Sequence, residues 1–418
     1  MDRLKITGKN KLKGSISVHG AKNSALPILV SSLLNKNDLV LKNIPEVDDI
    51  SNMLKLLKSF GSKINKNKTS LIINNNKIKN ISADYDIVRK MRASILLLGP
   101  LLSRFGYARI SLPGGCAIGT RPIDIHLKGL SKLGVSFDIE NGFVVGKVKT
   151  TLKGNKINLP FPSVGATENI MMSAVLAKGE TLLLNSAKEP EIQDLGNCLN
   201  AMGAKISGHG SDKITIQGVE TLESAEHEII SDRIVAGTYI ILAIMLNSSF
   251  EVKKFNPKHI IALIKVLKKM GANISVFNNS IKINPSKNLR SCNVVTGPYP
   301  KFPTDLQAQL MALMSIVDGI SNIKETIFEN RFMHVPELNR LGANIKLNKD
   351  NAKIEGNQIF KGAQVMASDL RASVSLILAA LCAEGITTIN RVYHLDRGYE
   401  KIEKTIGKLG PKIKRLKT

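Results

Sequence analysis

The chain has 418 residues, 43% of them hydrophobic, which excludes an intrinsically disordered protein and allows two or three domains. Its formal net charge is +25, but aromatic residues make up 4% and tryptophan is absent, so a nucleic-acid surface built on base stacking is not expected. The apolar runs are too short to span a bilayer, and the first residues lack the apolar segment of a signal peptide. The four cysteines form no CxxC pair, so we expect a cytoplasmic protein without disulfides.

One short pattern recurs six times along the chain: an apolar helix end, a glycine and then a strand. The glycines follow one another at intervals of 68 to 73 residues, at Gly61, Gly134, Gly203, Gly271, Gly342 and Gly410. Such even spacing predicts six repeated units of about 70 residues. Each glycine lies where a helix ends, a position that favours a left-handed residue.

A second helix precedes each glycine and is rich in small and apolar residues. These helices are expected over residues 25–34, 93–102, 169–177, 234–246, 306–317 and 370–383. Because they are apolar on most faces, they should be buried. A short strand lies between the two helices, so each unit is predicted to be helix, strand, helix and two strands.

The two ends of the chain predict how the six units are grouped. After Gly410 too few residues remain for two strands, and residues 1–21 supply strands that should complete the sixth unit. We therefore expect two pseudo-threefold domains of three units each, residues 22–229 and residues 230–418 plus 1–21. Two connections, near residues 21 and 230, would join the domains. Such a double link favours hinge closure, and a ligand cleft is expected between domains that close in this way.

Several of the predicted buried helices begin with charged or polar residues. Asp232, Asp305 and Asp369 occupy equivalent positions in three units, as helix N-caps would. If the helix N-termini face one cleft, these groups converge there with three cations. The cations are Lys22, Arg92 and Arg121.

The stretch 111–126 places Cys116 in a loop with three glycines. Arg121 and Pro122 end the loop, and an amphipathic helix is expected over residues 123–133. A guanidinium and a helix N-terminus both attract anions, so the stretch suits a reactive cysteine beside a phosphate or carboxylate. A surface turn with an inert, buried cysteine fits the same residues.

Two later loops occupy the equivalent place in their own units and carry Arg331 and Arg397. Together with Arg121 they suggest an arginine cluster for an anion, although each arginine alone is typical of a surface. Residues 20–24 lack the glycine spacing of a P-loop, and no G-x-G-x-x-G opens a helix. The seven histidines are scattered, so neither a metal nor a bound cofactor is expected.

Ten motifs carry a family resemblance over essentially the whole chain. They are residues 20–27, 91–94, 112–119, 121–126, 163–167, 189–192, 302–309, 328–334, 369–373 and 396–399. In these motifs the sequence resembles the UDP-N-acetylglucosamine 1-carboxyvinyltransferases, enolpyruvyl transferases that begin bacterial peptidoglycan synthesis. The resemblance implies an inside-out α/β barrel of two domains with three units each, which agrees with the sixfold repeat.

The resemblance also implies a reaction in which phosphoenolpyruvate and UDP-GlcNAc give enolpyruvyl-UDP-GlcNAc and phosphate. Carbon 3 of phosphoenolpyruvate is protonated, the sugar 3-hydroxyl attacks carbon 2, and the tetrahedral intermediate expels phosphate. Such a site needs cations, one acid and one base. The implied acid is Cys116, which also forms a covalent adduct with phosphoenolpyruvate, and the implied base is Asp305. Lys22 and Arg397 complete the implied catalytic set.

The substrate contacts are likewise implied by the resemblance. Those to phosphoenolpyruvate are Lys22, Asn23, Arg121, Arg331, Asp369, Arg371 and Arg397. Those to UDP-GlcNAc are Asn23, Arg92, Arg121, Pro122, Ile123, Asp124, Ile125, Ser163, Val164, Gly165, Asp305 and Ile327. One residue departs from the family: Phe161 stands where many members have a lysine, which leaves the uridine-side contact open.

Three alternative functions fit some of these features. An enolpyruvyl transferase acting on shikimate 3-phosphate shares the barrel but lacks the Cys116 loop. A catalytically silent binding or regulatory paralogue is disfavoured by the retained Cys116, Asp305, Arg331 and Arg397. An RNA-binding scaffold rests only on the positive charge and predicts an RNA affinity that falls steeply with salt. No nucleic-acid or membrane partner is expected, and the oligomeric state is not predicted.

Overall fold

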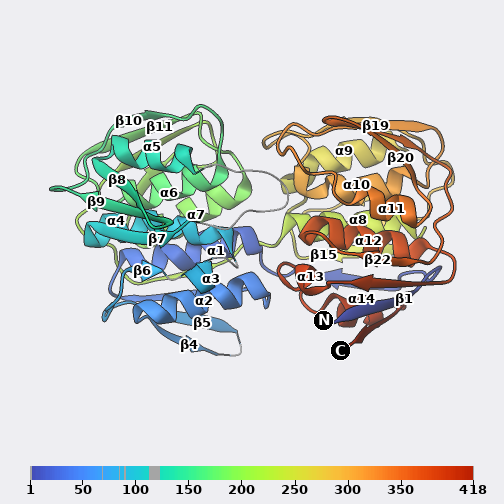
Figure 1. Cartoon of the computed structure of the whole chain (residues 1–418), viewed down its shortest axis with the longest axis horizontal. Coiled ribbons are helices and arrows are strands. Elements are labelled where there is room, and N and C mark those ends of the chain that lie inside the picture. The colour runs from blue at the N-terminus through green and yellow to red at the C-terminus, as the bar shows by residue number, and fades with distance from the viewer. Residues whose placement is uncertain (1, 68, 84, 89–90, 113–122, 418) are drawn as a thin grey trace. The chain divides into compact units, whose positions relative to one another are not determined.

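The computed structural model describes residues 2–67, 69–83, 85–88, 91–112 and 123–417, apart from the side chains of residues 86 and 87. These residues form two compact units, here called the first domain (20–112 and 123–230) and the second domain (2–19 and 231–417). Figure 1 shows the helices and strands of each domain.

The first domain contains three units. The first unit has α1 (Lys22–Ser31), η1 (Ser32–Leu34), β3 (Asp38–Lys42), α2 (Asp48–Phe60), β4 (Lys63–Lys66) and β5 (Ser70–Asn74). The second has β6 (Ser82–Ala83), α3 (Tyr85–Val88), η2 (Arg92–Leu97), α4 (Leu98–Phe105), β7 (Tyr107–Ser111), α5 (Asp124–Lys132), β8 (Val135–Glu140) and β9 (Phe143–Val148). The third has β10 (Lys156–Asn158), α6 (Val164–Ala174), β11 (Glu180–Leu184), α7 (Pro190–Ala201), β12 (Lys205–Ser207), β13 (Lys213–Gln217) and β14 (Ala225–Glu228).

The second domain repeats this plan. The N-terminal strands are β1 (Arg3–Thr7) and β2 (Ser15–Ser17). The fourth unit has α8 (Arg233–Met245), β15 (Phe250–Lys253), η3 (Pro257–Ile260), α9 (Ile261–Lys269), β16 (Asn273–Val276), β17 (Ser280–Asn284) and β18 (Asn293–Val295). The fifth has η4 (Thr304–Leu306), α10 (Gln307–Met314), β19 (Ile320–Lys324), α11 (Val335–Arg340), β20 (Asn344–Asn348), β21 (Asn351–Glu355) and β22 (Gln364–Met366). The sixth has α12 (Leu370–Cys382), β23 (Ile386–Asn390), α13 (Tyr393–Asp396), α14 (Ile402–Lys408) and β24 (Lys412–Leu416).

The described residues form six four-stranded sheets that share one plan. In each sheet a short strand pairs in parallel with a longer one, as β10 does with β11 through Ile157 and Leu183. The remaining pairs are antiparallel, as in β11 with β13 and β13 with β12. Apart from β2, which lies in the expected N-terminal strands, the short parallel strands were not predicted, because two to four residues carry too little alternation of apolar and polar side chains to be read as a strand.

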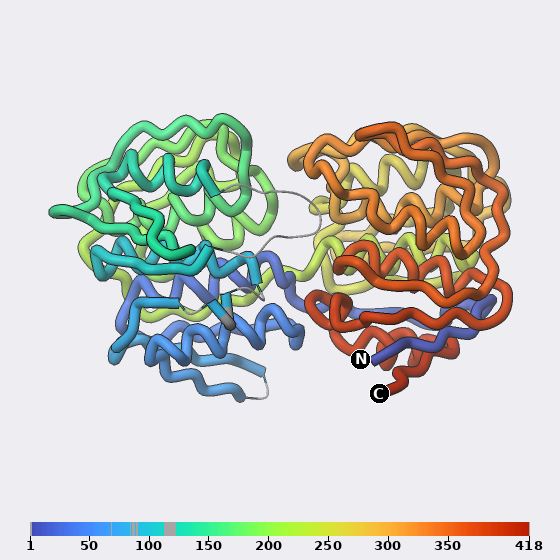
Figure 2. Tube along the Cα trace, in the orientation of Figure 1, coloured from blue at the N-terminus to red at the C-terminus, as the bar shows by residue number. Residues whose placement is uncertain are grey.

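Strands from distant parts of the sequence close each domain. In the first domain β14 pairs in parallel with β3, so the end of the third unit meets the first. In the second domain β1 lies between β23 and β24 and completes the sixth unit, as expected. Figure 2 shows this blue N-terminal strand beside the red C-terminal segment. The other N-terminal strand, β2, instead joins β15 in the sheet of the fourth unit.

Helices fill the interior of each domain. Every residue of α8 and of α10 is buried, including the polar ones, which confirms the prediction of buried helices. In the second domain α10 packs against α12 and α8, and in the first α4 packs against α6. Each domain has its own hydrophobic core. With helices inside and sheets outside, the fold is the inside-out α/β barrel that the family resemblance implied.

The six repeat glycines have the left-handed conformation predicted for them, with φ between +92° and +117°. An alanine Cβ at Gly203 would meet no heavy atom within 4 Å, whereas at Gly61 it would lie 2.6 Å from the carbonyl oxygen of Lys77. We expect Gly203→Ala to lower the free energy of unfolding by about 1–2 kcal/mol, the cost of the left-handed backbone. Gly61→Ala adds a clash and should cost clearly more in urea unfolding. Equal losses in the two variants would contradict this account.

Among the residues described, none of the helices combines the length and the apolar character needed to cross a membrane.

Candidate active site

The structure describes most, but not all, of the residues predicted for the site. Cys116, Arg121 and Pro122 lie outside the described residues. The remaining ones are divided between the two domains, and those of each domain are described by themselves. Within the described part of the chain, no group of three or more His, Cys, Asp and Glu side chains could hold a metal ion.

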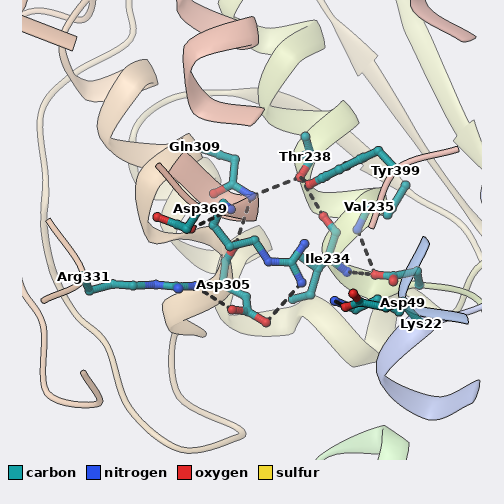
Figure 3. Close-up of polar contacts among 12 residues, drawn as sticks. Lys22, Asp49, Ile234, Val235, Thr238, Asp305, Gln309, Arg331, Asp369 and Tyr399 are labelled. Carbon is teal, nitrogen blue, oxygen red and sulfur yellow. Dashed lines mark hydrogen bonds and ion pairs between the residues drawn. The ribbon is translucent and has the colours of Figure 1, made fainter. Parts of the chain in front are cut away.

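Asp305 is the centre of the group in the second domain. Its Oδ1 lies 2.7 Å from Nη2 of Arg331, and its Oδ2 lies 3.2 Å from Nη2 of Arg371 (Figure 3). The two arginine side chains are 4% and 7% exposed, whereas the aspartate side chain is 28% exposed. A carboxylate that solvent reaches is therefore held in place by two buried guanidinium groups, which favour its ionised form.

The three equivalent aspartates divide into two kinds. Asp232 accepts hydrogen bonds from the backbone N–H groups of Ile234 and Val235, and Asp369 accepts them from Arg371 and Ala372. The capping prediction is confirmed for these two. It is wrong for Asp305, because Pro303 is the N-cap of η4 and no side chain caps this helix. The carboxylate of Asp305 binds the two arginines instead.

A hydrogen-bond network behind Asp305 joins three segments of the second domain. Nε2 of Gln309 donates to the backbone oxygen of Asp305 at 2.9 Å and to Oγ1 of Thr238 at 3.2 Å. Thr238 also bonds the hydroxyl of Tyr399 at 2.9 Å (Figure 3). Burial raises the pKa of Tyr399, so its hydroxyl stays protonated. The network fixes the start of α10 against α8 and the loop after α13.

Charge balance keeps Arg371 a cation. Burial alone lowers the pKa of Arg371, but the negative charge of Asp305 is the largest of several influences that raise it overall. The start of α12, which carries this arginine, is fixed by the cap that Asp369 provides. Arg371 is therefore both charged and rigidly placed, as binding of an anion requires.

The segment that carries Arg397 is tied to the C-terminal strand. Arg397 is half-buried and follows Asp396 directly. Both carboxylate oxygens of Asp396 bind the guanidinium of Arg415 in β24, at 2.6 and 2.9 Å. Because a bidentate pair fixes orientation as well as distance, it holds the backbone at Arg397.

In the first domain, Lys22 begins α1 and pairs with the first turn of α2. Its Nζ lies 3.0 Å from Oδ2 of Asp49, and both side chains are at least 90% buried. Asn23 follows it and is half-buried. The pair with Asp49 fixes the position of the Lys22 side chain, which suits the phosphate contact implied for Lys22.

Two groups of residues implied to contact UDP-GlcNAc, 123–125 and 163–165, lie at the starts of α5 and α6, whereas Arg92 begins η2, Asn23 lies in α1, and Asp305 and Ile327 belong to the second domain. Ser163 caps α6, and a Cβ on Gly165 would lie 3.0 Å from Cε1 of His126, so glycine lets α6 approach α5 closely. Nδ1 of His126 is 2.9 Å from Nδ2 of Asn169 in α6. The side chain of Phe161, which replaces the lysine of many family members, is exposed.

Acid should loosen this helix pair through His126. Burial, with a smaller effect from the positive charge of Arg92, lowers the pKa of His126 to about 4 from 6.5. Between these values the unfolded state binds more protons, so the free energy of unfolding falls as pH drops from about 6.5 to 4. The slope is at most about 1.4 kcal/mol per pH unit for this histidine. Urea unfolding of wild type and His126→Gln across this range should show a smaller slope in the variant; equal slopes would refute the assignment.

Sequence reasoning missed the residues that hold the site together, among them Asp49, Thr238, Gln309, Glu325 and Arg415. Their bonds to distant parts of the chain, such as Lys22 with Asp49 and Gln309 with Thr238, are not indicated by any local pattern. The motif 302–309 did include Gln309, but nothing in the sequence indicated its partners.

Solved structures with the same fold define the class. The enolpyruvyl transferase NikO from Streptomyces tendae matches with a TM-score of 0.89 at 23% identity, over 99% of this chain and 98% of that one. EPSP synthase from Acinetobacter baumannii matches with a TM-score of 0.78 at 19% identity, over 100% of both chains. The fold is that of the enolpyruvyl transferases.

Sequence relatives define the family. The family described as EPSP synthase (3-phosphoshikimate 1-carboxyvinyltransferase) matches residues 6–406. UDP-N-acetylglucosamine 1-carboxyvinyltransferase of Pelagibacter ubique (strain HTCC1062) is 52% identical, and UDP-N-acetylglucosamine 1-carboxyvinyltransferase 2 of Mesorhizobium japonicum is 49% identical, each over 100% of both chains. The chain belongs to the UDP-N-acetylglucosamine 1-carboxyvinyltransferases, a family of enolpyruvyl transferases.

Proposed function

We propose that this transferase moves the enolpyruvyl group of phosphoenolpyruvate to the 3-hydroxyl of the GlcNAc in UDP-GlcNAc and releases phosphate. The observation that carries the proposal is the carboxylate of Asp305, partly exposed and held by the buried Arg331 and Arg371. A base beside cations is what addition of a hydroxyl to an anionic enol phosphate requires. Full-length relatives that carry the name of this activity support the choice of substrates.

In this proposal Asp305 takes the proton of the sugar hydroxyl, and Arg331 and Arg371 stabilise negative charge on phosphoenolpyruvate. Lys22 and Arg397 bind the same anion from α1 and from the loop after α13. Cys116 protonates carbon 3 and forms the covalent adduct with phosphoenolpyruvate. The starts of α5 and α6 bind UDP-GlcNAc. The reaction would serve the first committed step of peptidoglycan synthesis in the cytoplasm.

The test is phosphate release from phosphoenolpyruvate, with and without UDP-GlcNAc, in wild type, Cys116→Ala and Cys382→Ala. Burial raises the pKa of Cys382 to about 12, so its thiol is inert and the variant is a matched control. We expect release that depends on UDP-GlcNAc in wild type and Cys382→Ala and is lost in Cys116→Ala. Release that persists in Cys116→Ala would keep the substrates but assign the acid elsewhere.

One observation favours a second candidate, since the matching family is described by a 3-phosphoshikimate activity. The same assay with shikimate 3-phosphate in place of UDP-GlcNAc tests it. Phosphate release that occurs with shikimate 3-phosphate but not with UDP-GlcNAc would make shikimate 3-phosphate the acceptor in place of the proposed sugar nucleotide. If wild type released no phosphate with either acceptor, the silent paralogue would be favoured.

A further inference from the structure

We infer that Glu325 is a positioning residue for the proposed reaction: its carboxylate holds the turn that carries Asp305 against the loop that carries Ile327 and Arg331. The inference rests on the proposed function, because it assigns to Asp305 the role of the base. Glu325 acts through the chain segments on either side of the Asp305–Arg331 pair.

The carboxylate of Glu325 accepts hydrogen bonds from three segments. Its Oε2 accepts from the hydroxyl of Thr304 at 2.9 Å. Its Oε1 accepts from the hydroxyl of Thr296 at 2.9 Å and from the backbone N–H groups of Ile327 at 2.9 Å and Phe328 at 3.4 Å. The residue is 3% exposed, so these bonds are shielded from water.

Two of the three bonded segments lead directly to the site. Thr304 immediately precedes Asp305 in η4. Ile327 is a residue implied to contact UDP-GlcNAc, and the guanidinium carbon of Arg331 lies 5.6 Å from the centre of the Phe328 ring. Arg331 then returns to Asp305 through the 2.7 Å ion pair. The contacts therefore form a closed ring, in which Glu325 joins the two chain segments on the side opposite the ion pair.

Two further hydrogen bonds hold the loop that carries Ile327 and Arg331 in place. The backbone N–H of Thr326 donates to Oγ1 of Thr296 at 2.9 Å, and Oγ1 of Thr326 donates to the backbone oxygen of Thr296 at 2.7 Å. Thr296 is 1% exposed and follows β18. The loop is thus fixed to the sheet at Thr296. Beside the backbone bond from the N–H of Gly297 to the oxygen of Phe302, the bond between Glu325 and Thr304 ties the loop to the turn of Asp305.

The test removes that bond alone. Thr304→Val deletes the hydroxyl that links Glu325 to the turn, and Thr304→Ser restores it. Thr387→Val is the matched control, because Thr387 is fully buried in the same domain and its hydroxyl has no hydrogen-bond partner within the described residues. We expect Thr304→Val to lower kcat about tenfold with KM for phosphoenolpyruvate within about twofold, since a misplaced base slows chemistry more than binding.

The pH profile separates positioning from folding. If Asp305 is held less tightly by its two arginines, it is protonated more easily, and the acid limb of kcat against pH should move to higher pH in Thr304→Val. Thr304→Ser and Thr387→Val should keep the wild-type limb. A lower fraction of folded enzyme would scale the whole profile without moving it. A Thr304→Val profile that is unchanged or only scaled would overturn the inference.

A second variant tests Glu325 itself. In Glu325→Gln, Oε1 can accept the three bonds it now accepts, and the amide can donate to the hydroxyl of Thr304, so kcat should stay within about threefold of wild type. Glu325→Ala loses every bond and should show a larger loss of kcat than Thr304→Val. If Glu325→Gln is as impaired as Glu325→Ala, the charge and not the positioning matters, and the inference fails. Absence of UDP-GlcNAc-dependent release in wild type would instead refute the proposed function.

Discussion

Asp305→Asn is expected to lower kcat by roughly 10²–10⁴-fold, the range that a general base contributes. The amide keeps the size of the carboxylate but cannot take a proton from the sugar hydroxyl. Its NH₂ group must also face a guanidinium, because Arg331 and Arg371 each donate to a different oxygen of Asp305. Phosphate release with saturating UDP-GlcNAc and phosphoenolpyruvate measures the effect.

Asp318→Asn is the control for this experiment. Asp318 is exposed in the same domain and accepts a hydrogen bond from Asn357 at 2.7 Å. Its replacement should leave kcat unchanged, since it binds neither arginine of the site. If Asp305→Asn retained a wild-type kcat while remaining folded, Asp305 would not be the base, and the proposed function would need another one.

The second large effect is on stability. Asp49→Ala is expected to lower the free energy of unfolding by roughly 3–5 kcal/mol, because it leaves the ammonium of Lys22 buried without the carboxylate 3.0 Å away. It also removes a negative charge from the first turn of α2, where the helix dipole favours one. Urea unfolding gives the change, and KM for phosphoenolpyruvate should rise because Lys22 is no longer held.

An exposed pair in the same domain provides the comparison. Lys42 and Glu226 join β3 to β14, and both side chains are solvent-exposed. Glu226→Ala should cost no more than about 1 kcal/mol, since water screens such pairs. The double variant Lys22→Met/Asp49→Ala should be less destabilised than the sum of its single variants. Additive losses would mean that the buried pair is not coupled, which would contradict the argument.

The fold was predictable to the extent that its signals are local. A helix that is apolar on most faces must be buried, and α8 and α10 are. A glycine between an apolar helix end and a strand indicates a left-handed cap, and all six repeat glycines have positive φ. The strands that close the domains were harder, because β2 is three residues long and β14 is four. Their register depends on partners that a local pattern does not identify.

The site was predictable in its residue types but not in its contacts. The motifs identified Asp305, Arg331 and Arg371 as functional residues, and the repeat placed Asp232, Asp305 and Asp369 in equivalent positions. Equivalence suggested one role for all three aspartates. The structure separates them, because Asp232 and Asp369 cap helices and Asp305 does not.

By itself, the sequence determined the sixfold repeat, the buried helices, the cap glycines and the family, because each depends on residues that are close together in the chain or on motifs that are complete. Only the tertiary structure decided which charges meet. Arg331 and Arg371 are 26 and 66 residues from Asp305, and Glu325 is 21 residues from Thr304. Such pairs form only after segments that are distant in the chain have packed together, since the hydrogen-bond partners of a side chain depend on what the fold brings within about 3 Å of it.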